Sequence, residues 1–149
     1  MRDLAYNKRG VFDYDLIEKY EAGVALIGAE VKSVRKGNVS LKGAFVTIKG
    51  GEMWLTNATI PPWQPANAPS DYDPTRPRKL LLKKTEIKRL IGAKESHGLT
   101  IVPIRLYNKR SLIKLEMALA RGKKQYQKKE QKREHDIKRE VERMLRGKE

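Results

Sequence analysis

Residues 121–133 (RGKKQYQKKEQKR) set the strongest limit on what this 149-residue chain can fold into. The run holds seven cationic residues against one anionic residue, and Tyr126 is its single large apolar side chain. Such a segment cannot bury enough apolar surface to offset the entropy of ordering its backbone, so the core has to come from the residues before it. We therefore predict a folded domain over residues 1–120 and a basic C-terminal tail over residues 121–149. By itself the run fits either a solubilising tail or a segment that binds a polyanion.

The end of the tail carries an apolar stripe at helical spacing. Ile137 and Val141 are four residues apart, and Met144 or Leu145 continues the series. This spacing predicts an amphipathic helix that forms on a partner. Because almost nothing between Ala120 and Ile137 can be buried, we expect the tail to be disordered when free and at least partly helical when bound.

The charge of the whole chain points to a polyanionic partner. The formal net charge is +15 and the sequence pI is about 10.1, which is typical of proteins that bind nucleic acid or an acidic membrane surface. Residues 1–119 carry +9 of that charge, so the folded domain should itself bind a polyanion. The absence of cysteine excludes disulfides, thiol catalysis and cysteine-ligated metals. No long apolar run marks a membrane span or signal peptide, so we expect a soluble, cytoplasmic protein with no membrane partner.

Alternating apolar and polar residues predict short strands in the first half of the chain. Apolar and polar side chains alternate over residues 11–16, and residues 24–27 are apolar. We interpret these segments as two strands joined by a tight turn at residues 21–23. A helix over residues 16–22 is the alternative. Residues 28–37 predict a helix of one to two turns that buries Val31 and Val34, begins near Glu30 and ends at Gly37. Residues 44–56 predict a β-hairpin around two consecutive glycines, with Trp54 on the opposite face to Met53 and Leu55.

The second half adds a long connector, a helix and another hairpin. Six of the seven prolines fall in residues 61–77, and such a density excludes regular structure. Residues 85–92 predict a helix that Thr85 caps and Gly92 closes, and residues 99–119 predict a hairpin with its turn at residues 108–111 and Pro103 at an edge or bulge. Six short strands and two short helices predict a mainly β fold, a small antiparallel OB-like β-barrel with flanking helices.

Three blocks of the sequence resemble one known family. They are YEAG…GAEVKSVRKG over residues 20–37, DPTRPRKLLL over residues 73–82, and GLTIVPIRLYNK…LARGKK over residues 98–124. Together they closely resemble the SsrA-binding protein family (small protein B), the bacterial partner of transfer-messenger RNA in ribosome rescue. The resemblance covers residues 7–129, and three blocks in order are far more specific than any one of them.

The resemblance implies an OB-like barrel that binds RNA and has no catalysis of its own. The barrel of the family grips the tRNA-like domain of transfer-messenger RNA, and the C-terminal tail occupies the decoding centre and the empty mRNA channel of a stalled ribosome. Residues matching family positions tied to RNA binding are Asn7, Glu21, Leu81 and Lys114. In the tail, Gly122, Lys123 and Lys124 match its start, and Tyr126 matches a position that can stack in the decoding centre. We expect a monomer.

One stretch of the tail departs from the family pattern. Many members carry an acidic residue followed by Lys-Arg where this chain has Gln127, Lys128 and Lys129. Lys128 and Lys129 still offer charge to the decoding centre, but the carboxylate is lost and lysine lacks the bidentate geometry of arginine. The contacts of these three residues therefore stay open.

Other charged residues of the folded domain suit RNA chemistry. Phosphate contacts can come from Lys32, Arg35, Arg76, Arg78, Lys79 and Lys114. Glu21 has two interpretations: its carboxylate accepts hydrogen bonds from a base edge or a 2′-hydroxyl, or it orients a neighbouring basic side chain.

Two rival functions share this composition. An enzyme acting on RNA would need an acid–base arrangement, but the only histidines are His97, beside a predicted turn, and His135, in the tail. The sequence also has no nucleotide-binding glycine loop and no metal-ligand cluster, so we expect no catalytic residue, metal or cofactor. The second rival is a general RNA-binding protein, such as a ribosomal protein or RNA chaperone, and only the three motif blocks count against it.

Overall fold

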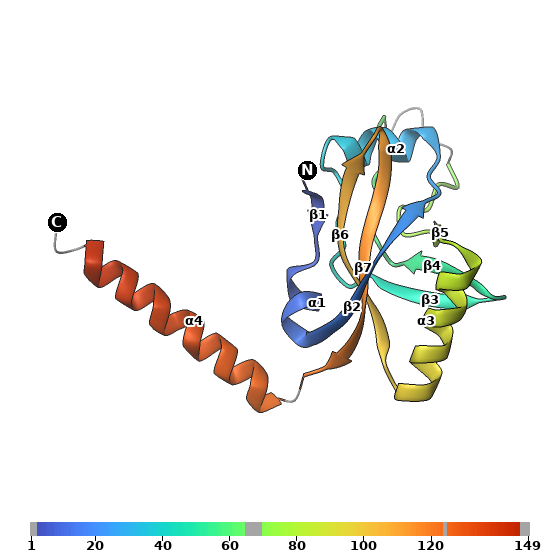
Figure 1. Ribbon diagram of the computed structural model, residues 1–149. Helices are drawn as coiled ribbons and strands as arrows, with labels where there is room; N and C mark the ends of the chain where they lie inside the picture. Colours follow the sequence, from blue (N-terminus) through green and yellow to red (C-terminus); the bar gives the residue numbers. More distant parts are fainter. Residues whose placement is uncertain (1–2, 65–69, 124, 147–149) are drawn as a thin grey trace.

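The computed structural model describes residues 3–64, 70–123 and 125–146. Within these residues, seven strands and four helices follow one another (Figure 1). In order they are β1 Asp3–Tyr6, α1 Lys8–Asp13, β2 Tyr14–Val24, α2 Gly28–Arg35, β3 Phe45–Lys49, β4 Glu52–Thr56, β5 Arg78–Leu81, α3 Lys84–His97, β6 Thr100–Lys109, β7 Leu112–Gly122 and α4 Gln125–Arg146.

The strands form one antiparallel sheet in the order β1-β6-β7-β2-β5-β4-β3. The sheet curls so that β3 also approaches β6, and one continuous core fills its concave side. Fully buried members include Leu55, Leu90, Leu106, Leu115 and Met117. The prediction of a mainly β, antiparallel, OB-like fold with flanking helices is confirmed. The barrel is open, because no ladder of backbone hydrogen bonds joins β1 to β3 in the described parts of the chain.

The sequence prediction was wrong at β2. In place of two strands with a turn at residues 21–23, one strand of 11 residues runs from Tyr14 to Val24, and residues 11–13 belong to α1. The supposed turn residues are paired in the sheet: Glu21 lies opposite Glu116, Ala22 opposite Leu115 and Gly23 opposite Lys114. The alternative helix over residues 16–22 is not adopted either. Pairing with the long strand β7 satisfies the backbone hydrogen-bonding groups of this stretch. A glycine in the sequence suggested a turn, because the partner strand cannot be recognised from neighbouring residues.

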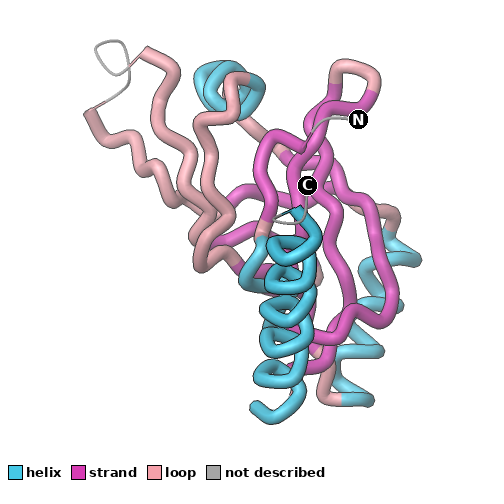
Figure 2. Tube along the Cα trace, turned by 90° about the vertical axis from the view of Figure 1, so that its left-hand side faces the viewer, coloured by secondary structure: helices cyan, strands magenta, loops and turns pink. Residues whose placement is uncertain are grey.

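The other predicted elements of the folded domain are present. The β3–β4 hairpin turns at Gly50 and Gly51, both with positive φ, and α2 buries Val34. Helix α3 is longer than expected: it begins at Lys84, with Lys83 and not Thr85 as its N-cap residue, and it runs through Gly92 to His97 and ends at Gly98, whose φ is +61°. The β6–β7 hairpin has an irregular register just after Pro103, as expected for a proline in a strand. Figure 2 shows the connector between β4 and β5 standing out to one side of the sheet.

Helix α4 extends away from the sheet as a single helix of 22 residues (Figure 1). Strand β7 continues to Gly122, two residues beyond the predicted end of the folded domain. The apolar stripe of α4 is exposed, with Ile137, Val141, Met144 and Leu145 each showing 48–62% of their surface. The helical spacing predicted from the stripe is therefore present, while disorder of the free tail stays a prediction. No helix among the described residues is long and apolar enough to cross a membrane.

Candidate nucleic-acid interface

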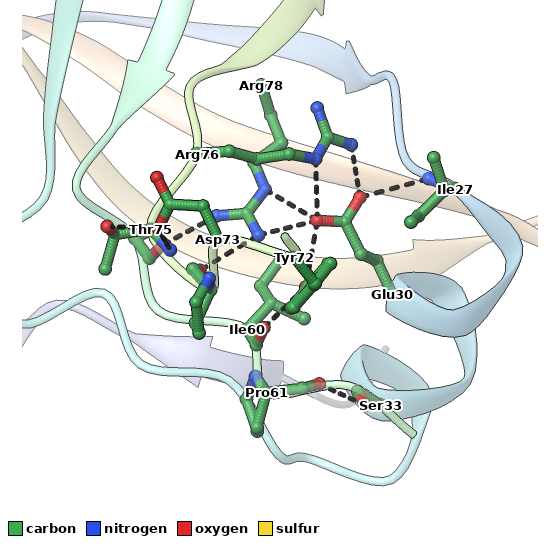
Figure 3. Close-up of polar contacts among 12 residues, drawn as sticks. Ile27, Glu30, Ser33, Ile60, Pro61, Tyr72, Asp73, Thr75, Arg76 and Arg78 are labelled. Carbon is green, nitrogen blue, oxygen red and sulfur yellow. Dashed lines mark hydrogen bonds and ion pairs between the residues drawn. The ribbon is translucent and has the colours of Figure 1, made fainter. Parts of the chain in front are cut away.

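A buried ionic cluster joins α2 to the start of β5, and it contains two of the predicted phosphate ligands (Figure 3). The side chain of Glu30 is fully buried. Its Oε2 accepts from Nε and Nη2 of Arg78 at 3.0 and 2.6 Å and from Nε of Arg76 at 3.0 Å. Nη2 of Arg76 donates to Oε1, the backbone N–H of Ile27 donates to Oε1 at 3.0 Å, and the hydroxyl of Tyr72 donates to Oε2 at 3.2 Å.

This cluster is structural. Arg78 is fully buried, and it also donates to the carbonyl oxygens of Ala58 and Pro74 at 2.6 and 3.0 Å. Burial alone would raise the pKa of Glu30, but the hydrogen bonds from Arg76, Ile27 and Arg78 outweigh it and hold that pKa below its usual value. The predicted phosphate contact by Arg78 does not fit these surroundings, and Arg76 is only partly exposed, with its guanidinium committed to Glu30. A single sequence does not reveal such a partner, because 48 residues separate Arg78 from Glu30.

Asn7 also makes structural contacts within the folded domain. Only 8% of its surface is exposed. Its Nδ2 donates to the carbonyl of Pro103 at 2.8 Å, and its Oδ1 accepts from the N–H of Gly10 at 3.1 Å. The side chain therefore caps α1 and fastens it to β6. RNA contact by Asn7, implied by the family resemblance, stays a prediction.

Glu21 lies on the outer face of β2 and orients neighbouring side chains. The hydroxyl of Tyr107 donates to Oε2 of Glu21, and Nζ of Lys109 lies 3.2 Å from the same oxygen. The hydrogen bond from Tyr107 is the main reason that the pKa of Glu21 is lowered. Burial and the bond to Glu21 raise the pKa of Tyr107. These contacts support the interpretation of Glu21 as a structural partner, although the residue is still exposed.

A surface hollow brings together three of the predicted RNA-binding residues. We call it the Leu81 hollow; its lining includes Gly23, Val31, Arg35, Leu81, Leu112 and Lys114. It forms because the sheet register places Leu81 opposite Gly23 and Gly23 opposite Lys114. Leu81 is 54% exposed, which is unusual for a leucine beside a core, and exposed apolar groups among cations suit the bases and phosphates of RNA.

Gly23 keeps this hollow open. A Cβ built at Gly23 would lie 3.3 Å from the Cβ of Leu81, tighter than most such contacts, so a larger residue would displace Leu81 or fill the hollow. Gly23 and Leu112 are the residues that the sequence analysis missed. Leu112 is 59% exposed at the tip of the β6–β7 hairpin, and an exposed leucine has no signature in a single sequence.

The other predicted phosphate ligands of the folded domain lie outside the buried cluster. Lys32 is exposed on α2, and its side chain makes no ion pair with any described residue. Lys79 is partly exposed and lies 3.1 Å from Glu52 across the sheet. Arg35 is exposed but donates to the carbonyl of Ser111 at 2.7 Å.

The start of the tail is fastened to α1. The N–H of Lys123 donates to the carbonyl of Asp13 at 3.0 Å, and Nζ of Lys128 lies 3.4 Å from the Asp13 carboxylate. Gly122 is exposed at the end of β7, and Lys129 is exposed on α4. The backbone of Tyr126 lies in α4, but its side chain and the whole of Lys124 lie outside what the structure describes.

The described residues include no group of three or more histidine, cysteine, aspartate or glutamate side chains that could hold a metal ion. His97 ends α3 and His135 is exposed on α4.

Comparison with known proteins identifies the family. The family model described as "SmpB protein" matches residues 4–147. An SsrA-binding protein from Sulfurihydrogenibium sp. (strain YO3AOP1) is 52% identical over 145 residues, covering 97% of this chain and 95% of the relative. One from Carboxydothermus hydrogenoformans is 47% identical over 144 residues, covering 97% and 96%. A solved structure titled "tmRNA-SmpB: a journey to the center of the bacterial ribosome" is 46% identical, with a TM-score of 0.64 over 80% of this chain and 84% of that one. The chain belongs to the SmpB family of SsrA-binding proteins.

Proposed function

We propose that this protein binds the tRNA-like domain of transfer-messenger RNA (SsrA RNA) and delivers it to stalled ribosomes for trans-translation. The observation that carries the proposal is the Leu81 hollow, where Leu81, Lys114 and Arg35 meet on the surface of a chain from this family. An exposed leucine offers contact to a base or ribose, and the ammonium of Lys114 offers a phosphate contact. Binding of this kind needs no catalytic group, and it takes place in the cytoplasm, where ribosomes work.

The C-terminal tail then serves the ribosome. We propose that residues 121–149 occupy the decoding centre and the empty mRNA channel of the small subunit. The length of α4 and its density of lysine and arginine support this, because a phosphate-lined channel screens the repulsion among those cations. The ammonium of Lys128 lies against the Asp13 carboxylate, so Lys128 would have to exchange this carboxylate for an rRNA phosphate on the ribosome.

The test separates the two parts by truncation. The cut belongs after Lys123, because Gly122 still pairs with Tyr14 in the sheet and the N–H of Lys123 donates to Asp13. The shortened protein should keep most of its affinity for a transcript of the tRNA-like domain, measured by fluorescence anisotropy, and should lose peptide tagging on stalled ribosomes. Loss of RNA binding on truncation would refute this division of labour.

A matched competitor decides between this role and a general RNA-binding role. Unlabelled structured RNA of equal length, such as a 5S rRNA transcript, is titrated against the bound tRNA-like domain. Specific binding predicts that the competitor displaces the labelled RNA only at much higher concentration than unlabelled tRNA-like domain does. Equal competition would identify the protein as a general RNA binder or chaperone.

A further inference from the structure

The turn between β6 and β7 has a conformation that its own residues do not favour. Only Arg110 and Ser111 separate the paired residues Lys109 and Leu112. Both turn residues have positive φ, +50° and +66°. A two-residue hairpin turn of this kind is normally built from Asn-Gly or Gly-Gly, because a Cβ disfavours the left-handed region. An arginine and a serine hold such a turn only where neighbouring groups stabilise it.

Contacts from two directions stabilise the turn. On one side, Nη2 of Arg35 donates to the carbonyl oxygen of Ser111 at 2.7 Å. On the other, Nζ of Lys109 lies 3.2 Å from the carboxylate of Glu21 on β2. Arg35 is the last residue of α2, and the first turn of that helix is anchored through Glu30 in the buried ionic cluster. Helix α2 lies across the end of the hairpin (Figure 1). Because the buried ionic cluster anchors this helix, its position is fixed independently of the turn.

The conformation of the turn decides where Leu112, one of the side chains of the Leu81 hollow, lies. Leu112 follows the turn directly, and Lys114 lies two residues further on the same strand face. Both line the hollow together with Leu81 and Arg35. A change in the turn would therefore move Leu112 relative to Leu81, which is held on β5 opposite Gly23, and relative to Lys114, whose backbone is paired in the sheet.

We propose that Arg35 is a positioning residue for RNA binding and not a phosphate ligand. Its guanidinium holds the carbonyl of Ser111, keeps the turn in its left-handed conformation, and so presents Leu112 to the RNA beside Lys114 in the Leu81 hollow. This inference rests on the proposed function and deepens it by assigning how the site is preorganised. It replaces the phosphate contact that the sequence suggested for Arg35.

A phosphate ligand and a positioning residue differ in how their loss changes the salt dependence of binding, and in whether a second substitution can restore the affinity. Losing a phosphate contact makes the negative slope of log affinity against log salt less steep by about 0.7–0.9. Losing a positioning contact reduces the fraction of protein whose site is formed, which weakens binding by the inverse of that fraction at every salt concentration. We expect Arg35→Ala to weaken binding roughly five- to tenfold with the slope unchanged. Adding Ser111→Gly should restore most of the loss, since glycine adopts the left-handed conformation readily.

The experiment uses the full chain and a transcript of the tRNA-like domain. Dissociation constants are measured between about 50 and 200 mM salt for the wild type, Arg35→Ala, Ser111→Gly and the double variant. Lys88→Ala is the matched control, because Lys88 is an exposed cation on α3, a helix that does not line the Leu81 hollow, and it has no ion-pair partner among the described residues. Amide NMR signals of Ser111 and Leu112 in the free proteins report the turn directly.

Several results would overturn the proposal. One is an Arg35→Ala variant with unchanged affinity. Another is an Arg35→Ala variant whose slope of log affinity against log salt is less steep by about 0.7–0.9, as expected for the loss of a phosphate contact. The third is a double variant that binds no better than Arg35→Ala. Unchanged Ser111 and Leu112 amide signals in Arg35→Ala would also contradict it. A wild-type protein that fails to bind the transcript would instead refute the proposed function, so the two failures are distinguishable.

Discussion

Glu30→Gln should destabilise the protein strongly, because Glu30 is the only anion among the described residues that contacts the fully buried Arg78. Six hydrogen bonds converge on the Glu30 carboxylate from Arg76, Arg78, Tyr72 and the Ile27 amide. Glutamine has the same shape, but one of its two terminal atoms is a donor and would face other donors. Removing one partner of a buried ion pair typically costs about 3–5 kcal/mol, since the other charge stays buried.

The expected change is large enough to measure without ambiguity. For a chain of this length, about 3–5 kcal/mol corresponds to a fall in Tm of roughly 6–20 °C. Urea unfolding followed by circular dichroism gives the free energy of unfolding without adding salt. Glu95→Gln is the matched control, because Glu95 is exposed on α3 and has no ion-pair partner in the described part of the chain. It should change stability by no more than about 0.5 kcal/mol.

A pH series tests the cause. The pKa of Glu30 is lowered in the folded state, so its carboxylate stabilises the protein above the unfolded-state pKa of about 4.3 and this contribution is lost as pH falls through the lower folded-state pKa. The difference between wild type and Glu30→Gln should be full at pH 7 and should shrink below about pH 4.3. The reasoning is refuted if Glu30→Gln is as stable as Glu95→Gln, or if the difference does not depend on pH.

Three further predictions concern RNA and the tail. Leu81→Ala should weaken binding of the tRNA-like domain with little change in Tm, because Leu81 is 54% exposed; an unchanged affinity would remove Leu81 from the interface. If the folded domain neutralises about five phosphates, log affinity should fall with log salt at a slope of about −3.5 to −4.5, whereas a slope near zero would exclude charge as the source of affinity. Lys138→Pro should break α4 at a cost of about 3 kcal/mol and abolish tagging without affecting RNA binding, while Lys138→Ala should tag normally; normal tagging by the proline variant would show that the helix is not needed.

Local patterns in the sequence were enough to predict most of the secondary structure. The β3–β4 and β6–β7 hairpins, the short helix α2 and the helical stripe of α4 each follow from periodicity and turn residues within a short window. The failure at β2 has a physical cause. Gly23 looked like a turn residue, but its place opposite Leu81 and Lys114 in the middle of a sheet depends on strands far away in the sequence.

The roles of the charged residues also depend on partners that the sequence does not reveal. Arg35, Arg76, Arg78 and Lys114 are indistinguishable as cations in a sequence, and all four were predicted to contact phosphate. The fold buries Arg78 against Glu30 and commits Arg76 to the same carboxylate. It turns Arg35 toward the carbonyl of Ser111 and leaves Lys114 lining the hollow.

Four properties could be predicted from the order of amino acids alone: the basic character of the chain, its antiparallel β class, its family through three ordered motif blocks, and the helical spacing of the tail. These properties depend on composition and on neighbours within a few residues. Folding of the whole chain sets which cations are exposed and which are buried in ion pairs, and the sheet register places Leu81 beside Gly23 and Lys114. Burial and long-range pairing cannot be predicted from neighbouring residues, because they depend on packing that makes Glu30 and Arg78, 48 residues apart, immediate neighbours.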